Sequence, residues 1–206
     1  MSQETGRQEI NPYSCRVDGR ETMVIERTGP RSTLVFGGAR SGKSRFAEKL
    51  AAKSGLQKIY VATGAAFDAE MADRIAAHKR QRGDGWQTIE EQIDLADVLA
   101  RECRPGCVVL VDCLTLWLSN LTFAEKDIAA ETARLCEAVR ELPSASIFVS
   151  NEVGMGIVPD NRLSRSFRDA QGRLNQDIAD ACSQVVFVAA GLPLLMKPDP
   201  HMDIAL

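Results

Sequence analysis

Short apolar segments that alternate with helix-like segments constrain the fold of this chain more than any other feature. The run "STLVF" (32–36) is followed by a helical pattern from Gly42 to Ser54, and "KIYVAT" (58–63) by another from Asp68 to about Gln81. Strands that are apolar along their whole length must be covered on both faces. The alternation therefore predicts an α/β fold, a doubly wound and mostly parallel sheet with helices on both faces. The further expected strands are 86–91, 107–112, 145–150 and 184–191, and the further expected helices occupy 94–103, stretches that end by Leu142, and Asn161–Ala181.

One domain is the expectation for a chain of 206 residues, which is long enough for a sizeable core and short for two cores. Residues 1–32 are polar and show no hydrophobic period, so we expect a flexible N-terminal extension in which Met23–Ile25 could form a short strand. Residues 33–197 then form the doubly wound domain, and residues 198–206 form a C-terminal tail.

Charge and hydropathy argue against several classes of function. The formal net charge of −3 and a pI near 5.5 argue against nucleic acid as a partner, which would favour a basic surface. The longest apolar run, which starts at Cys107, is too short to span a membrane and contains Asp112. The N-terminus lacks the apolar segment of a secretory signal, and the six cysteines are scattered, as in proteins that keep their thiols reduced. We therefore expect a cytoplasmic protein with no membrane span.

The segment "GGARSGKS" lies directly between an expected strand and an expected helix, and it matches the pattern G-x-x-x-x-G-K-S/T. In such a loop, backbone N–H groups surround phosphate oxygens and the helix N-terminus adds the positive end of its dipole. Lys43 is expected to reach the β- and γ-phosphates, and Ser44 to bind Mg²⁺. The motif predicts a nucleoside triphosphate site made of Gly37, Gly38, Ala39, Arg40, Ser41, Gly42, Lys43 and Ser44.

Asp112 ends the apolar run "CVVLVD". In P-loop proteins a carboxylate at such a strand end supports the Mg²⁺ shell, so Asp112 joins Ser44 as a candidate metal ligand. The alternative is an ordinary polar residue at the end of a strand. The chain lacks the N-K-x-D stretch with which GTP switches read guanine, and it is small and acidic for a nucleic-acid motor. A small-molecule kinase or nucleotidyltransferase fits the size better.

The segment "RIAAHKRQR" (74–82) places His78, one of only two histidines, among four cations. On spacing alone, two interpretations remain open. The cations could simply solvate an exposed helix face beside a stray histidine. They could also hold phosphates next to a histidine nucleophile.

Four blocks of the chain, in order, resemble the bifunctional adenosylcobinamide kinase/adenosylcobinamide-phosphate guanylyltransferase family of cobalamin biosynthesis. The resemblance covers roughly Thr33 to Lys197. The blocks are "FGGARSGKSRFAE", "YVATG" with "DAEMADRIAAHKRQRGDGWQTIEE", "VLVDCLTLWLSNL", and "FVSNEVGMGIVPDNRLSRSFRDAQGRLNQ". The part "NEVGMGIVPDNRLSR" is the most specific of them.

The resemblance implies two reactions. Phosphate from ATP or GTP first goes to the hydroxyl of adenosylcobinamide, and GMP from GTP then goes onto that phosphate, giving adenosyl-GDP-cobinamide. In this family GMP is carried by a histidine in a motif like R-I-x-x-H-K/R, which corresponds to Arg74–Lys79 and identifies His78 as the catalytic residue beside Lys43. The resemblance also implies Mg²⁺ and a ring of identical subunits, a trimer. The nucleotide contacts implied beyond the phosphate loop are Ala62, Thr63, Gly64, Lys79, Arg80, Gln81, Arg82, Glu90 and Asp112.

The chemistry of His78 agrees with this role. A histidine attacks the α-phosphorus only with a neutral ring, and neighbouring cations disfavour the imidazolium form while they hold phosphate oxygens.

For several other positions, two interpretations remain open. Ala62–Gly64 and Glu90 could contact nucleotide or be a plain turn and strand end, and Asn151 with Glu152 could handle substrate or Mg²⁺ or merely cap and turn. A P-loop kinase without guanylyltransferase activity is the alternative for the whole chain.

Overall fold

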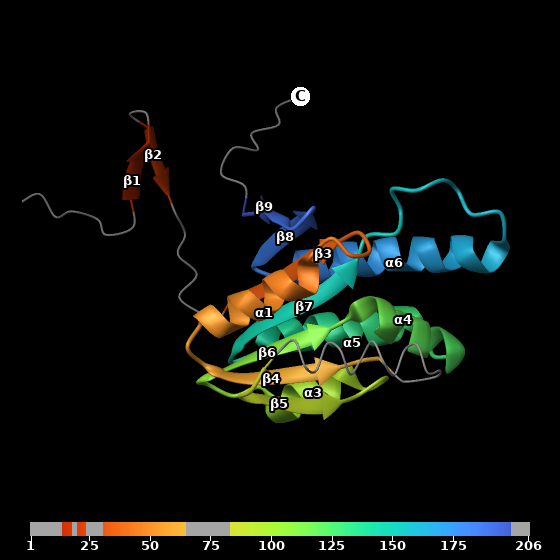
Figure 1. Cartoon of the computed structure of the whole chain (residues 1–206), viewed down its shortest axis with the longest axis horizontal. Coiled ribbons are helices and arrows are strands. Elements are labelled where there is room, and N and C mark those ends of the chain that lie inside the picture. Colours follow the sequence, from red (N-terminus) through yellow and green to blue (C-terminus); the bar gives the residue numbers. More distant parts are fainter. Residues whose placement is uncertain (1–13, 18–19, 24–30, 65–82, 199–206) are drawn as a thin grey trace, which may run out of the picture.

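The computed structural model of the chain describes residues 14–17, 20–23, 31–64 and 83–198 (Figure 1). Seven of the described strands form one sheet in the order β5-β4-β6-β7-β3-β8-β9. All neighbouring strands in it are parallel except β8 and β9, which pair antiparallel. The strands are β3 (Ser32–Gly37), β4 (Gln57–Ala62), β5 (Trp86–Glu90), β6 (Cys107–Asp112), β7 (Ala145–Asn151), β8 (Gln184–Ala189) and β9 (Leu192–Lys197).

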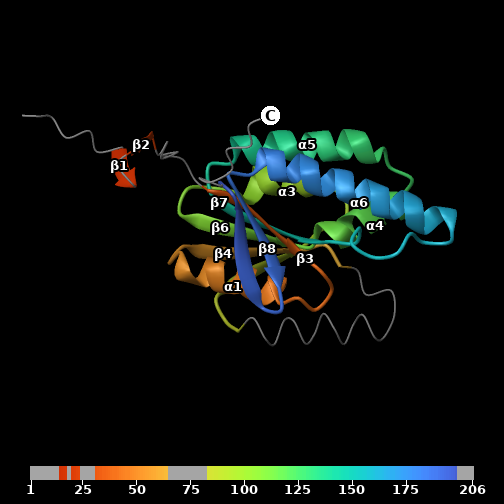
Figure 2. The ribbon, with the colours of Figure 1, turned by 90° about the horizontal axis from the view of Figure 1, so that it is seen from above.

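Helices cover both faces of this sheet, which confirms the doubly wound fold expected from the sequence. Figure 2 shows α1 alone on one face among the described helices, and α3, α4, α5 and α6 together on the other. The described helices are α1 (Lys43–Lys53), α3 (Leu95–Glu102), α4 (Leu114–Phe123), α5 (Ile128–Glu141) and α6 (Arg162–Ala181). None of them is long and apolar enough to cross a membrane.

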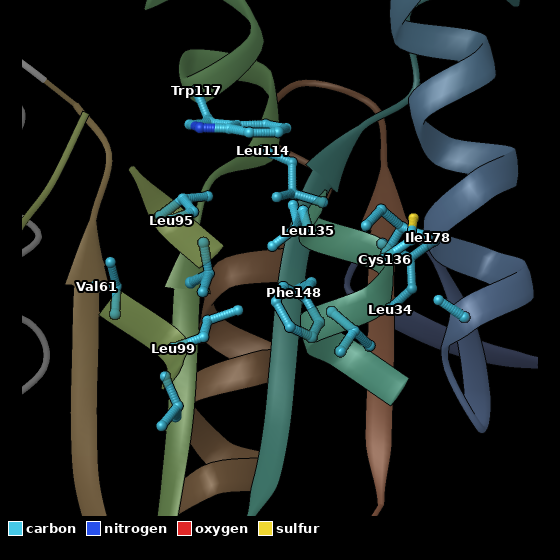
Figure 3. Packing of buried hydrophobic residues seen from close by; sticks show 14 of the residues in the cluster. Leu34, Val61, Leu95, Leu99, Leu114, Trp117, Leu135, Cys136, Phe148 and Ile178 are labelled. Atoms are coloured by element: carbon cyan, nitrogen blue, oxygen red, sulfur yellow. The ribbon is translucent and has the colours of Figure 1, made fainter. Parts of the chain in front are cut away.

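The apolar strands are explained by this double cover. Along β6, Val109 and Val111 pack into the layer under α3–α6, while Val108 and Leu110 pack into the layer under α1. Because successive side chains of a strand point to opposite faces, a strand covered twice has no polar side. Figure 3 shows part of the larger layer, in which Phe148 from β7 packs with helical side chains.

The sequence did not predict β9. The hairpin that joins β8 to β9 has Ala190 and Gly191 as its two loop residues, with φ of 51° and 78°. Two positive φ values in a two-residue loop define a type I′ turn, which usually carries Asn-Gly or Asp-Gly, so Ala-Gly gave no turn signal. β9 also contains Pro193, which a strand tolerates at the sheet edge.

The N-terminal part contains a second, two-stranded antiparallel sheet, made of β1 (Ser14–Val17) and β2 (Arg20–Met23). The short strand considered at Met23–Ile25 overlaps β2 at Met23 only, and residues 24 and 25 lie outside the described residues. The main sheet begins at Ser32, the last residue of the expected extension. The domain limits themselves stay predictions.

Candidate nucleotide-binding site

The expected site residues that the structure describes gather at one edge of the sheet. β3 ends at Gly37 and β7 at Asn151, and these two residues are register partners. On the other side of β7, Asp112 ends β6 and pairs in register with Ala62 of β4, which in turn pairs with Glu90 of β5. Parallel strands therefore bring residues 37, 62, 90, 112 and 151 to a common carboxyl edge, where ligands bind in open α/β sheets.

The phosphate loop is folded onto the start of α1. Ser41 N–H donates to the Gly38 carbonyl at 3.2 Å, and the Lys43 ammonium donates to the same carbonyl at 3.3 Å. Gly42, the residue before the helix, has φ of 95° and no side chain caps the helix start. The first N–H groups of α1, which no side-chain cap satisfies, are the usual donors to phosphate oxygens.

Glycine is required at Gly37 for a steric reason. A Cβ atom added there would lie 2.2 Å from the backbone carbonyl oxygen of Val188 in β8. The Gly191 N–H group donates to the Ser41 carbonyl at 2.8 Å, so the hairpin after β8 also holds the loop from outside. The neighbouring strand thus fixes the path of the loop as closely as the motif itself does.

Asp112 lies on the same face of the sheet as α1. Its side chain follows the alternation of Val108 and Leu110, which face that helix. The pKa of the Cys113 thiol is affected by its burial and by nearby charges. This pKa is raised to about 11, mainly by burial and also by the charge of Asp112, while Lys43 acts to lower it. Lys43 and Asp112 therefore both lie within electrostatic reach of this buried thiol.

Thr63 is fully buried and joins the ends of β4 and β6. Its hydroxyl donates to the Cys113 carbonyl at 2.7 Å and accepts from the Cys113 N–H group at 2.8 Å. The Thr63 carbonyl accepts from the side-chain amide of Asn120 in α4 at 2.8 Å. The structure gives the Thr63 hydroxyl this bridging position, while Ala62 and Gly64 beside it are half-buried.

Two acidic residues, Glu90 and Glu91, lie at the end of β5. Glu90 is exposed at the end of the strand. The Glu91 carboxylate accepts from the N–H groups of Ile93 and Asp94 at 2.8 and 2.9 Å and so shapes the turn before α3. Trp117 of α4 donates to the Ile93 carbonyl at 2.7 Å and holds the same turn.

A polar cluster at the end of β7 was not predicted. The Ser150 hydroxyl donates to Asn175 Oδ1 at 2.6 Å, and Gln171 Nε2 donates to both Ser150 Oγ and Asn175 Oδ1 at 3.0 Å. Asn175 Nδ2 donates to the Asn151 carbonyl at 3.1 Å, and the Asn151 N–H group donates to Thr115 Oγ1 at 2.9 Å. We call Thr115, Ser150, Asn151, Gln171 and Asn175 the amide cluster. Its one sequence signal is the pair of amides four residues apart in α6, on the same buried face as Leu174 and Ile178.

Five of the expected site residues lie outside the described residues. They are His78, Lys79, Arg80, Gln81 and Arg82. Arg162, Arg165 and Arg168 recur every three residues, a spacing that would put them on one helix face towards the corrinoid phosphate, towards solvent or at a subunit contact. Arg165 instead donates to the carbonyls of Pro159 and Asp160 at 3.0 and 2.7 Å, which closes the loop before α6. Arg168 pairs with the neighbouring Asp169 at 2.9 Å.

A strand, a glycine loop and a helix that starts with Lys43 and Ser44, in a parallel sheet with another strand that ends in Asp112, define a P-loop nucleotide-binding protein. The sequence pattern of the family described as cobinamide kinase / cobinamide phosphate guanyltransferase matches residues 33–196. The chain belongs to this family. By that membership it is a bifunctional transferase of cobalamin biosynthesis.

Two curated relatives match over nearly their whole length. The bifunctional adenosylcobalamin biosynthesis protein CobP of Pseudomonas aeruginosa is 49% identical over 81% of this chain and 98% of its own. CobU of Escherichia coli, with the same description, is 41% identical over 80% of this chain and 98% of its own. Among solved structures, the RadB recombinase matches with 16% identity and a TM-score of 0.47, over 77% of this chain and 74% of that chain. A likeness of that degree says nothing about the reaction.

Proposed function

We propose that the chain uses ATP or GTP to phosphorylate adenosylcobinamide, and then transfers GMP from GTP to the new phosphate through a GMP–histidine intermediate at His78. The product is adenosyl-GDP-cobinamide. The observation that carries the proposal is the phosphate loop, with Lys43 held over the Gly38 carbonyl and the start of α1 left without a side-chain cap, in a chain of this family.

The kinase step needs a cradle for the triphosphate more than it needs covalent chemistry from the protein. Backbone N–H groups of the phosphate loop and the Lys43 ammonium bind the β- and γ-phosphates and offset the charge that spreads over the γ-phosphoryl oxygens. The Ser44 hydroxyl and the Asp112 carboxylate are oxygen donors on one face of the sheet edge and fit Mg²⁺, which prefers few protein ligands beside phosphate and water. When bound, Mg²⁺ neutralises charge on the β- and γ-phosphates.

The guanylyl step places the reacting nitrogen on His78. A bond forms between the neutral imidazole and the α-phosphorus of GTP as the bond to pyrophosphate breaks. An oxygen of the cobinamide phosphate then attacks the same phosphorus, and the imidazole leaves. Four cations lie close to His78 in the sequence, where they would keep its ring neutral and hold phosphate oxygens. They are Arg74, Lys79, Arg80 and Arg82.

The finer expectations about assembly and compartment belong to the same proposal. A homotrimer would cover exposed apolar side chains, since large exposed apolar patches mark interaction surfaces. Cytoplasmic location agrees with five described cysteines that are buried and free. Light scattering of the purified protein measures the assembly. The exposed apolar side chains that a trimer would cover are Phe123, Met155, Ile157, Val158 and Leu163 beside α4 and α6, and Leu192, Leu194 and Leu195 on β9.

Incubation with GTP labelled at the α-phosphate tests the central step. We expect a covalent, acid-labile label on the wild-type protein, no label on His78→Ala, and full label on His201→Ala, which removes the other histidine. His78→Ala should still phosphorylate adenosylcobinamide. A wild-type protein that phosphorylates adenosylcobinamide but never takes up label would instead be the P-loop kinase without guanylyltransferase activity.

A further inference from the structure

Asn151 lies between the two strands that carry the phosphate-binding residues. β7 separates β3, which runs into the phosphate loop, from β6, which ends in Asp112. Asn151 is the last residue of β7 and the register partner of Gly37. The next N–H group, that of Glu152, donates to the Gly37 carbonyl at 3.0 Å. The end of β7 is thus bonded directly to the start of the phosphate loop.

The alternation along β7 gives the direction of the Asn151 side chain. Phe148 packs under α3–α6, and the Ser150 hydroxyl bonds to Gln171 and Asn175 of α6. Ile147 and Val149 pack on the opposite face, under α1. Asn151 follows these two, so its side chain points to the face on which α1 begins with Lys43 and Ser44. Asp112 shares that face.

The backbone of Asn151 is held from two sides, while its side-chain oxygen is not. Thr115 accepts from its N–H group and Asn175 donates to its carbonyl. Its Oδ1 atom is buried and has no hydrogen-bond partner among the described residues. A buried polar atom left unpaired costs about 1–3 kcal/mol, so native structures rarely keep one without a use.

A second buried oxygen in the same state lies in the phosphate loop. Ser41 Oγ has no partner among the residues that the structure describes, and a Cβ atom added to Gly37 would lie 3.0 Å from it. The residues that carry the two unpaired oxygens are both neighbours of Gly37, one in the loop and one in β7. Two unpaired buried oxygens on residues that neighbour one glycine of the phosphate loop indicate a place that is completed by a polar ligand.

We propose that the side-chain amide of Asn151 contacts the γ-phosphoryl group and the attacking hydroxyl in the kinase step, an inference that rests on the kinase activity proposed above. The amide N–H donates to a γ-phosphoryl oxygen, and Oδ1 accepts from the hydroxyl of the acceptor. The hydroxyl oxygen bonds to the γ-phosphorus as the bond from that phosphorus to the β–γ bridging oxygen breaks. The nucleoside diphosphate leaves with the electron pair, and the hydroxyl proton is released to water.

An amide suits this place better than a charged group. It offers a donor and an acceptor side by side, so it can hold the two reactants that meet in the transfer. A carboxylate there would keep the acceptor but repel the phosphoryl oxygens. The amide cluster fixes the position of Asn151 through its backbone, which leaves the side chain free to face the reactants.

The test compares three variants with the wild type in two separate assays. The assays are phosphorylation of adenosylcobinamide by ATP, and guanylylation of adenosylcobinamide phosphate that is supplied ready-made. For Asn151→Ala we expect kcat of phosphorylation to fall about 10²-fold, the loss typical of one transition-state hydrogen-bond donor, with ATP affinity changed less than threefold. Guanylylation should be nearly unchanged, since the γ-phosphoryl group is not transferred in that step. Asn151→Asp should lose more than Asn151→Ala.

Asn175→Ala separates a direct contact from a structural effect. It removes the donor to the Asn151 carbonyl but keeps the Asn151 side chain, so it should lower stability with a smaller loss of kcat. Equal losses of kcat in the two alanine variants at equal loss of stability, or equal losses in both assays, would overturn the inference. So would Asn151→Asp with wild-type kcat, a variant of nearly the same shape. If the wild type itself does not phosphorylate adenosylcobinamide, the proposed function fails and takes this inference with it.

Discussion

The phosphate loop and the amide cluster meet at Gly37 and Asn151, yet they are built in opposite ways. The loop is eight consecutive residues, Gly37–Ser44, and its shape follows from local backbone bonds and from glycine. The amide cluster draws its five residues from α4, β7 and α6, which are far apart in the chain, and Asn151 takes part through its backbone. The first kind of site is visible in a sequence because the order of residues is the site. The second exists only after the strands and helices have packed.

Substitutions in the two regions should also affect different properties of the protein. A change in the loop should remove nucleotide binding or transfer, because its groups contact the phosphates. A change in the amide cluster should act first on stability, and on transfer only through Asn151. The predictions below probe this contrast from the largest expected effect to the smallest.

Lys43→Ala should have the largest effect. It removes a cation from the phosphates, and one such charge-stabilising group is worth on the order of 10²–10³ in kcat. Steady-state assays should show both activities reduced, with the free energy of unfolding unchanged. Lys49→Ala, an exposed lysine on the same helix, is the control and should behave as the wild type. Full activity in Lys43→Ala would mean that the loop does not bind the triphosphate.

Gly37→Ala should have the next largest effect, a loss of stability caused by a clash at the loop. The new Cβ would meet the Val188 carbonyl oxygen at 2.2 Å, so β3 and β8 must move apart. Overpacking of this kind costs roughly 1–3 kcal/mol or more, which urea unfolding measures. Gly38→Ala is a matched control, because a Cβ at Gly38 has no atom within 4 Å. Equal stability of the two variants would contradict the close approach of β8 to the loop.

The phosphate loop and the contact between Gly37 and β8 show which features of the site could be predicted from the sequence and which could not. The strand–loop–helix order around "GGARSGKS" predicts the loop, and the apolar runs predict the parallel sheet, because both signals are local. That Gly37 needs to be glycine because of β8 could not be predicted, since Val188 is 151 residues further along the chain. For the same reason Ser150, Gln171 and Asn175 read as ordinary polar residues until the fold brought them together. β9 was missed because its turn, Ala190-Gly191, lacks the usual residues.

Asn175→Ala should have a moderate effect, and mainly on stability. It leaves Ser150 Oγ and Gln171 Nε2 without their shared acceptor and the Asn151 carbonyl without its donor. Unpaired buried polar groups cost about 1–3 kcal/mol, so the free energy of unfolding should fall by that order. Gln176→Ala, one residue further along α6 and exposed, should cost much less. Similar losses in the two variants would show that the cluster does not hold β7 to α6.

The smallest effect at neutral pH concerns two buried thiols, one beside each region. Cys113 lies beside Lys43 and Asp112, and Cys182 follows α6, the helix that carries two members of the amide cluster. Burial raises the pKa of Cys113 from 9.0 to about 11 and that of Cys182 from 9.0 to about 12. In the unfolded chain both thiols ionise near pH 9, while in the folded chain they stay protonated until a higher pH. The folded state then holds more protons, so their contribution is complete below pH 9 and is lost as the pH rises toward the folded values.

Urea unfolding at pH 8 and pH 10 measures this loss. Lysines and tyrosines also titrate in that range, so the informative quantity is the difference between the wild type and Cys182→Ala. We expect the stability of the wild type to fall more steeply between the two pH values than that of Cys182→Ala, because the variant lacks one thiol that ionises only on unfolding. Nucleotide should not change this difference, since Cys182 lies away from the loop. Cys113→Ala should show a similar difference without nucleotide and a slightly larger one with it, because phosphate held by Lys43 offsets the positive charge that lowers the pKa of that thiol. Parallel pH dependence of all three proteins would contradict the raised thiol pKa values, and an equal response of both variants to nucleotide would contradict the separation of the two regions.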